Sequence, residues 1–271
     1  MIPDSPIAEP TFSPADLDRV LTETFVDRVD YRQEMASTNT RTLELAGEAP
    51  EGRSCCLVLA DRQTAGRGRG ANSWWSAGGA LTFSVLFRTP EFDLPVSRWP
   101  QMSLTVGLAV CEAAESLLPG ANVALKWPND VYLDGRKLAG ILVETADNRQ
   151  GSVVLGIGIN VNNSSLLAPQ ELRDKAISLR DVAGRDIPRI DVLVAVLRRL
   201  AMRIDWLAAG IDELQETWSR RCLLTGRGVE IELPARRIAG HCQGIDRDGA
   251  LLVATDAGIE RCLSGVVIKF D

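Results

Sequence analysis

The apolar pattern of the chain changes near residue 224, and this change limits the possible folds more than any other feature of the sequence. Beyond it, short runs rich in Val, Ile and Leu follow one another closely, with Asp248-Gly249 and Ala257-Gly258 as turns. Short strands joined by tight turns are typical of a small β-barrel. We expect these strands at residues 229–233, 237–245, 250–255, 259–263 and 266–270.

Before residue 222, apolar runs of strand length alternate with stripes at helical spacing. The strand candidates are residues 55–60, 80–87, 121–127, 139–146 and 152–161. Helices are expected at residues 14–26, after the helix start Ser13-Pro14, and at residues 40–46, 102–117, 192–207 and 211–221. This order predicts a flexible tail over residues 1–13, a domain of helices and strands over residues 14–222, and a small all-β domain over residues 223–271.

The composition is that of an ordinary globular protein, with 45% hydrophobic and 24% charged residues among 271. A net charge of -6 without a long basic stripe argues against a broad nucleic-acid-binding face. The six cysteines form no Cys-x-x-Cys pair and the single His241 lies beside Cys242, so we expect neither disulfides nor a metal site. Residues 1–14 do not have the pattern of a signal peptide, and residues 151–170 are too polar to span a membrane. We therefore expect a cytoplasmic protein.

A Gly/Arg segment, Gln63-Thr64-Ala65-Gly66-Arg67-Gly68-Arg69-Gly70, follows the strand candidate at residues 55–60. Glycines let the backbone approach a ligand closely, and arginines are bidentate donors for a carboxylate or phosphate. The segment matches neither the P-loop pattern nor the GxGxxG pattern of dinucleotide sites. Because Trp74, Trp75 and another strand follow at once, we interpret it as an anion-binding loop built into the fold.

Three further segments contain candidate site residues. Lys126-Trp127-Pro128-Asn129-Asp130 and the strand opened by Lys137 predict a β-hairpin, with turns at residues 128–130 and 134–135, which places Lys137 and Asp130 near one sheet end. Gly156 and Gly158 interrupt an apolar strand, which indicates the close approach of a ligand or of another part of the chain. Ser37-Thr38-Asn39 alone predicts only a helix start.

Taken together, these segments resemble the biotin–protein ligases. The resemblance rests on Ser37-Thr38-Asn39 and on residues 63–69, 126–130, 137–144 and 156–161 in that order, and residues 244–251 are similar to the family's C-terminal barrel. It extends from about residue 31 to the end of the chain. It implies an α+β fold, in which a mixed-sheet catalytic domain like that of class II aminoacyl-tRNA synthetases precedes a small SH3-like β-barrel.

The resemblance also implies a reaction and its residues. Biotin and ATP, with Mg²⁺, would give biotinyl-5'-AMP and pyrophosphate, and a lysine of a biotin carboxyl carrier domain, such as that of acetyl-CoA carboxylase, would then take the biotinyl group. The implied catalytic residues are Lys137, Arg67 and Arg69. The implied biotin-binding residues are Ser37, Thr38, Asn39, Gln63, Arg67, Gly68, Arg69 and Lys137. The implied nucleotide-binding residues are Arg69, Trp74, Asn129, Asp130 and Asn160, and no residue is assigned to a metal.

The sequence departs from the family in two places. Gly70-Ala71-Asn72-Ser73 stands where many bacterial members have a second basic Gly-Arg unit. Too few residues precede Ser37 for the DNA-binding helix-turn-helix of some members, so we expect a monofunctional ligase, monomeric or homodimeric, that binds neither DNA nor membranes. The alternatives are a lipoate or octanoate ligase or transferase of the same fold, a noncatalytic nucleic-acid-binding module, and a dinucleotide-dependent oxidoreductase, which would need a GxGxxG motif before a helix.

Overall fold

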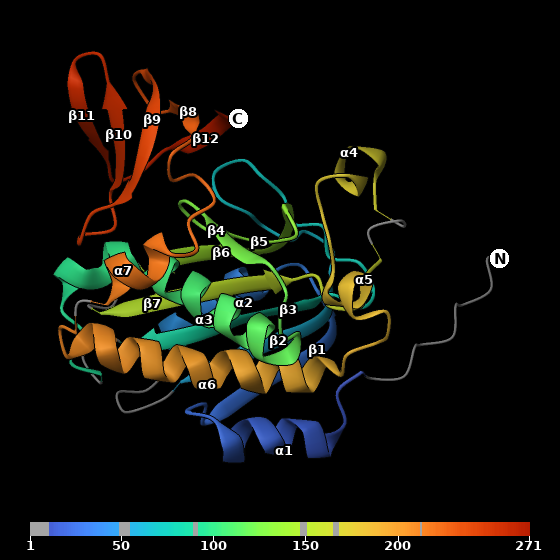
Figure 1. Cartoon of the computed structure of the whole chain (residues 1–271). Coiled ribbons are helices and arrows are strands. Elements are labelled where there is room, and N and C mark those ends of the chain that lie inside the picture. The colour runs from blue at the N-terminus through green and yellow to red at the C-terminus, as the bar shows by residue number, and fades with distance from the viewer. Residues whose placement is uncertain (1–10, 49–54, 89–91, 147–150, 165–167, 212) are drawn as a thin grey trace.

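The computed structural model describes residues 11–48, 55–88, 92–146, 151–164, 168–211 and 213–271. These residues form one sheet of seven strands and one of five, and their helices pack mainly on the larger sheet (Figure 1). The helices are α1 (Pro14–Glu23), α2 (Thr38–Glu48), α3 (Met102–Leu117), α4 (Gln170–Arg173), α5 (Leu179–Ala183), α6 (Arg189–Ala208) and α7 (Leu214–Ser219), with the 3-10 helix η2 (Val96–Gln101) directly before α3.

The larger sheet is mixed, as expected, and its strands lie in the order β1-β2-β3-β7-β6-β5-β4. Strands β1 and β2 run parallel because α2 carries the chain back between them, and all other neighbours are antiparallel. The strands are β1 (Arg28–Met35), β2 (Cys56–Gln63), β3 (Leu81–Arg88), β4 (Val123–Lys126), β5 (Asp130–Leu133), β6 (Arg136–Thr145) and β7 (Ser152–Ile159).

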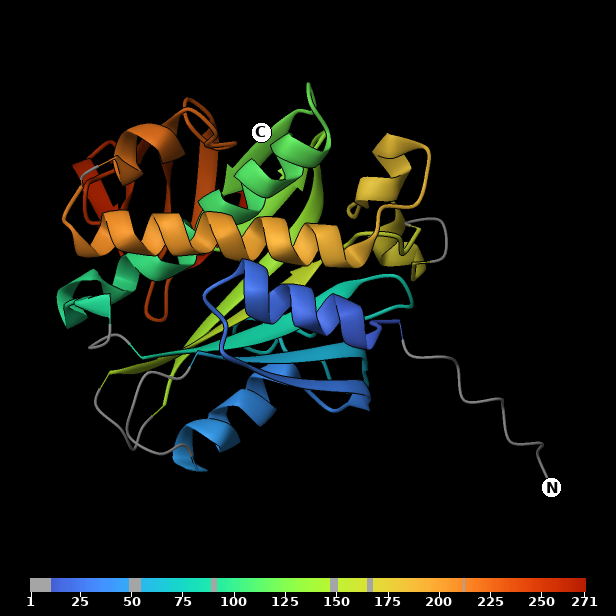
Figure 2. The same cartoon turned by 90° about the horizontal axis from the view of Figure 1, so that it is seen from below.

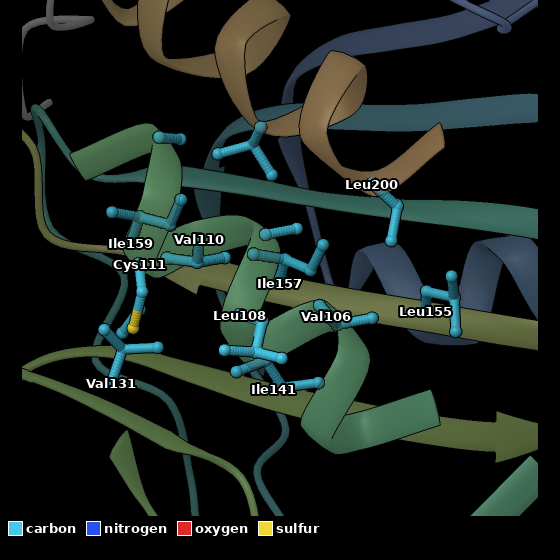
Figure 3. Close-up of a cluster of buried hydrophobic side chains, with 14 of the residues drawn as sticks. Val106, Leu108, Val110, Cys111, Val131, Ile141, Leu155, Ile157, Ile159 and Leu200 are labelled. Carbon is cyan, nitrogen blue, oxygen red and sulfur yellow. The ribbon is translucent and has the colours of Figure 1, made fainter. Parts of the chain in front are cut away.

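Helices cover both faces of this sheet (Figure 2). Helix α3 is buried on nearly all sides because it lies between the sheet and α6, which explains its almost uniformly apolar sequence. Figure 3 shows side chains of α3 such as Val106 and Leu108 among those of β6 and β7, with Leu200 of α6 nearby. On the opposite face, Leu45 of α2 packs with Val58 of β2 and forms a second, smaller core.

All five strands expected in the larger domain are present, as β2, β3, β4, β6 and β7. Strand β1 was missed because it is a polar edge strand with no fully buried residue, so its sequence has no apolar run. One turn was also placed wrongly: Asp130 is not part of the turn but opens β5, where it pairs with Lys126 on one side and Gly140 on the other. The segment predicted as one hairpin therefore contains three strands, β4, β5 and β6.

The C-terminal sheet contains the five strands expected from the sequence: β8 (Gly228–Glu232), β9 (Arg237–Ile245), β10 (Leu251–Thr255), β11 (Gly258–Cys262) and β12 (Val266–Phe270). They are all antiparallel, in the order β11-β10-β9-β8-β12. The sheet is tied to the rest of the chain by hydrogen bonds from Trp127 Nε1 to the Gly249 carbonyl, 3.2 Å, and from Gln101 Nε2 to the Arg247 carbonyl, 3.2 Å. These bonds fix the C-terminal sheet beside the turn between β4 and β5.

The helix start at Ser13 is confirmed, because Ser13 and Asp16 form a reciprocal capping box at the beginning of α1. Phe12 is buried and packs edge-on against Tyr31. Residues 11–13 therefore belong to the folded structure, and the rest of the predicted tail, residues 1–10, lies outside the described residues.

None of the six cysteines forms a disulfide, and all except the partly exposed Cys222 are buried. His241 is an exposed residue of β9, as expected. Within the described parts of the chain, no helix combines the length and the apolar character needed to cross a membrane.

Candidate active site

A cavity of about 670 Å³ lies between the larger sheet and the C-terminal sheet. Its walls include the start of α2, the loop between β2 and β3, the turn before β5, parts of β6 and β7, and two segments of the C-terminal sheet. Concave sites with a few converging polar groups are the usual form of small-ligand sites. The predicted site residues in these walls are Ser37, Thr38, Asn39, Gln63, Arg67, Gly68, Arg69, Trp74, Asn129, Asp130 and Lys137.

One end of the cavity is a wall of polar groups that already bind one another. Gln63 Oε1 accepts hydrogen bonds from the backbone N–H of Thr38, at 2.7 Å, and from its hydroxyl, at 3.1 Å. Ser84, which is fully buried on β3, lies 2.8 Å from Thr38 Oγ1 and donates to Asn39 Oδ1 at 2.6 Å. The Ser37 hydroxyl accepts from the first turn of α2, as expected of a helix start. These groups are therefore held in place before any ligand binds.

The two glycines of β7 make room for two of the predicted site residues. A Cβ atom at Gly156 would lie 1.9 Å from Asn39 Oδ1, and one at Gly158 would lie 2.4 Å from Cε2 of Trp74. Both distances are far below van der Waals contact. The close approach predicted from the sequence is thus made by side chains of the site itself, Asn39 and Trp74.

The Gly/Arg segment is an ordered loop. Hydrogen bonds from Gly68 N to the Asn72 carbonyl, 2.8 Å, and from Trp74 N to the Gly66 carbonyl, 2.9 Å, fold it back on itself. Arg67 reaches across to Glu144 of β6, where its Nη2 lies 2.5 Å from Oε1 of the carboxylate. This ion pair connects the loop to the sheet.

Arg69 connects the same loop to the C-terminal sheet, because its guanidinium donates to the backbone carbonyl of Gly265. Burial lowers the pKa of Arg69, and the charge of Asp130 acts in the opposite direction. An arginine stays charged in proteins, so the site keeps this positive charge against the cost of burial.

The lysine predicted to be catalytic lies beside the carboxylate expected to be near it. Lys137 Nζ is 2.7 Å from Asp130 Oδ1, and 36% of the lysine side chain is exposed. A second lysine, Lys126, directs its Nζ to the Val267 carbonyl at 3.4 Å and over the Phe270 ring at 5.2 Å. Burial lowers the pKa of Lys126, and Asp130 partly counteracts this effect.

The cavity is suited to an anionic ligand although the chain as a whole is acidic. The cationic side chains in its walls are Arg67, Arg69, Lys126 and Lys137, and the carboxylates in its walls are Asp130 and Glu232. Arginine forks and lysine point charges are the usual partners of carboxylates and phosphates.

Asn160 is the one predicted site residue that is not among the residues in the cavity wall. It is buried behind the cavity wall, where its amide donates to the Lys137 carbonyl at 3.3 Å and accepts from Asn163 at 2.8 Å. The bond to the Lys137 carbonyl helps to fix the backbone at Lys137 from outside the cavity.

The described residues contain no cluster of three or more His, Cys, Asp or Glu side chains able to hold a metal ion. Mg²⁺ in phosphoryl-transfer sites is commonly bound by one or two carboxylates together with substrate phosphates. Asp130, in the cavity wall, fits that pattern.

Sequence reasoning missed several residues of the site. Ser84 lies on a strand whose pattern indicates only core packing, and Lys126 and Glu144 were quoted in motifs without a role. Residues 232–234 and 264–267 of the C-terminal sheet also line the cavity. Only the five-strand pattern of that sheet was visible in the sequence, and nothing in the pattern indicated where it docks.

Comparisons with known proteins agree with this geometry. Residues 31–162 match the model of the biotin/lipoate A/B protein ligase family, and residues 225–269 match that of the biotin protein ligase C terminal domain. The chain is 37% identical to the biotin--[acetyl-CoA-carboxylase] ligase of Mycobacterium tuberculosis over 224 residues, which cover 80% of each chain. It is 36% identical to the bifunctional ligase/repressor BirA of Bacillus subtilis over 247 residues, 90% of this chain and 74% of the other.

A solved structure gives the same result. The biotin protein ligase from Aquifex aeolicus in complex with biotin and ATP superposes with a TM-score of 0.75 and 33% identity, over 90% of this chain and 98% of the other. This match covers both the larger sheet and the C-terminal sheet of the chain. The chain belongs to the biotin protein ligase family.

Proposed function

We propose that this protein attaches biotin to a lysine of a biotin carboxyl carrier domain, with biotinyl-5'-AMP as the intermediate. The observation that carries the proposal is the cavity, in which the predicted biotin motif and the cationic Gly/Arg loop share one space with Lys137. The match of residues 225–269 to the C-terminal domain of biotin protein ligases favours biotin over lipoate or octanoate. The relatives named as ligases of acetyl-CoA carboxylase supply the class of acceptor.

In the first step, a carboxylate oxygen of biotin attacks the α-phosphorus of ATP. A new P–O bond forms while the bond to pyrophosphate breaks, and negative charge accumulates because both reactants are anions. Preorganised cations stabilise such a transition state. Lys137 supplies that charge from β6, and Arg67 and Arg69 supply it from the loop, where one contacts the larger sheet and the other the C-terminal sheet.

Mg²⁺ bound to the phosphates would neutralise part of their charge, with Asp130 as the protein carboxylate able to reach it. The remaining task of the protein is to keep water away from the mixed anhydride. The Gly/Arg loop does this in the proposal, since Arg69 holds it against the C-terminal sheet.

In the second step, the amine of the acceptor lysine attacks the biotinyl carbonyl carbon. A C–N bond forms, the C–O bond to phosphorus breaks, AMP leaves and the amine loses a proton. We propose that the reaction takes place in the cytoplasm, where the free cysteines would stay reduced, and that the protein, monomeric or homodimeric, does not bind DNA, as its net charge of -6 favours.

The proposal is tested by incubating the purified protein with biotin, ATP, Mg²⁺ and an isolated carrier domain. Mass spectrometry of the carrier should show one added biotinyl group on its acceptor lysine. A carrier whose acceptor lysine is replaced by arginine is the control. Absence of the added group, with a correctly folded carrier, would contradict the proposal.

A further inference from the structure

We infer that Glu144 is a positioning residue that joins the biotin end of the cavity to the Gly/Arg loop. One carboxylate oxygen, Oε2, accepts from Asn39 Nδ2 at 2.9 Å, and the other, Oε1, lies 2.5 Å from Arg67. Glu144 does not line the cavity, so it acts through these two neighbours. The inference rests on the proposed function, since it concerns the biotin site of the same cavity.

The sheet register explains why one carboxylate can reach both partners. Gly156 of β7 pairs with Ser84 of β3 on one side and with Leu142 of β6 on the other. The Asn39 side chain fills the space above Gly156, where a Cβ atom would collide with it. Glu144 is two residues beyond Leu142, so its side chain leaves the same face of the strand.

Asn39 has no hydrogen-bond donor left for a ligand. Its amide donates to the Leu142 carbonyl at 3.2 Å and to Glu144 at 2.9 Å, while its oxygen accepts from Ser84 at 2.6 Å. A primary amide has two N–H donors, and both partners of Nδ2 are pure acceptors, which also fixes the orientation of the amide. Asn39 therefore shapes the biotin end of the cavity as part of a fixed wall.

These contacts form one continuous chain of polar groups. It runs from Gln63 through Thr38, Ser84 and Asn39 to Glu144 and ends at Arg67. Gln63 and Arg67 lie only four residues apart in the sequence. The hydrogen-bond network therefore ties both ends of this short segment to the larger sheet. Charge-assisted bonds such as those of Glu144 are the stronger members of such networks.

The test is the variant Glu144→Gln. A neutral amide keeps the shape of the side chain but removes the charge and turns an acceptor into a donor, which then faces the donor groups of Asn39 or Arg67. We expect the dissociation constant for biotin, measured by titration calorimetry without ATP, to rise about tenfold, as for the loss of one charge-assisted bond. The KM for ATP should change by less than about twofold in carrier biotinylation, because neither partner of Glu144, Asn39 or Arg67, is among the residues expected to bind the nucleotide.

Glu260→Gln is the matched control. Glu260 is a strand residue whose carboxylate pairs with Arg236 on the surface of the C-terminal sheet, at 2.8 Å. This variant should bind biotin as the wild type does. The double variant Asn39→Ala with Glu144→Gln should bind biotin no more weakly than the weaker of the two single variants, because both substitutions break the same hydrogen-bond network.

Unchanged biotin affinity in Glu144→Gln would overturn the inference, and so would equal losses for biotin and ATP, which would indicate a general structural defect. If Glu144→Gln does not fold, Glu144→Asp takes its place: the shorter side chain keeps the charge but cannot reach both partners, and weaker biotin binding is again expected. A wild-type protein that binds no biotin would contradict the proposed function itself.

Discussion

Each cation expected to meet the substrates already has an acceptor within the protein. Lys137 lies against Asp130, Arg67 against Glu144, and Arg69 against the carbonyl of Gly265. Before substrate binds, these partners hold the cations in position. When substrate binds, its oxygens must replace the partners or share the cations with them. This arrangement preorganises positive charge at the point where negative charge develops.

The variant Lys137→Ala tests this preorganisation of charge at the lysine expected to be catalytic. The rate of adenylate formation should fall by roughly 10²–10³-fold, the usual effect of losing one charge-stabilising donor. Lys137 is only partly exposed and is paired with Asp130. The variant should still lose only about 1 kcal/mol of stability in denaturant unfolding, because the pair is in contact with solvent.

Gly158→Ala tests the close contact between β7 and Trp74. The new Cβ atom would lie 2.4 Å from the rigid indole, so the ring must move, at a typical overpacking cost of about 1–3 kcal/mol. Thermal unfolding and tryptophan fluorescence should both change. Gly47→Ala, with open space around the new atom at the end of α2, should leave the fluorescence unchanged, and equal behaviour of the two variants would be inconsistent with the described packing.

At the scale of elements, the sequence predicted what depends on local pattern. The strands with apolar runs and the helices α3 and α6, whose apolar residues recur at helical spacing, were found within a few residues of their true bounds. The polar edge strand β1 was missed because only its pairing with β2 makes it a strand, and β5 was missed because four residues between two turns give too little periodicity. The motifs of the site were found because they carry unusual residue types, whereas Ser84 and Glu144 acquire a role only from the register of β3, β7 and β6.

The Gly/Arg loop is the element whose position the proposed reaction needs most. Arg69→Gly removes its bond to the carbonyl of Gly265 and increases its flexibility. We expect more biotinyl-AMP to escape into solution, measured as free adenylate after rapid filtration, while the adenylate still forms. The control is Arg185→Gly, which lies in an exposed loop far along the chain and should release no more adenylate than the wild type. If Arg69→Gly and the wild type release equal amounts of adenylate, the Gly/Arg loop does not retain the intermediate.

At the scale of the whole molecule, the cavity exists because two sheets meet. The C-terminal sheet contributes residues 232–234 and 264–267 to its walls and is held there by bonds from Trp127, Gln101 and Lys126. The sequence predicted that this sheet exists but not where it docks, since docking depends on side chains that are distant in the chain. The position indicates that the C-terminal sheet takes part in enclosing the substrates.

In the proposed function, this cavity activates the carboxylate of biotin with ATP. The most direct measurement is the burst of pyrophosphate released by the purified protein with ATP and Mg²⁺, with biotin in one reaction and lipoate or octanoate in another. We expect a burst with biotin and none with the other two acids. A burst with lipoate or octanoate alone, or no burst with any of the three, would contradict it.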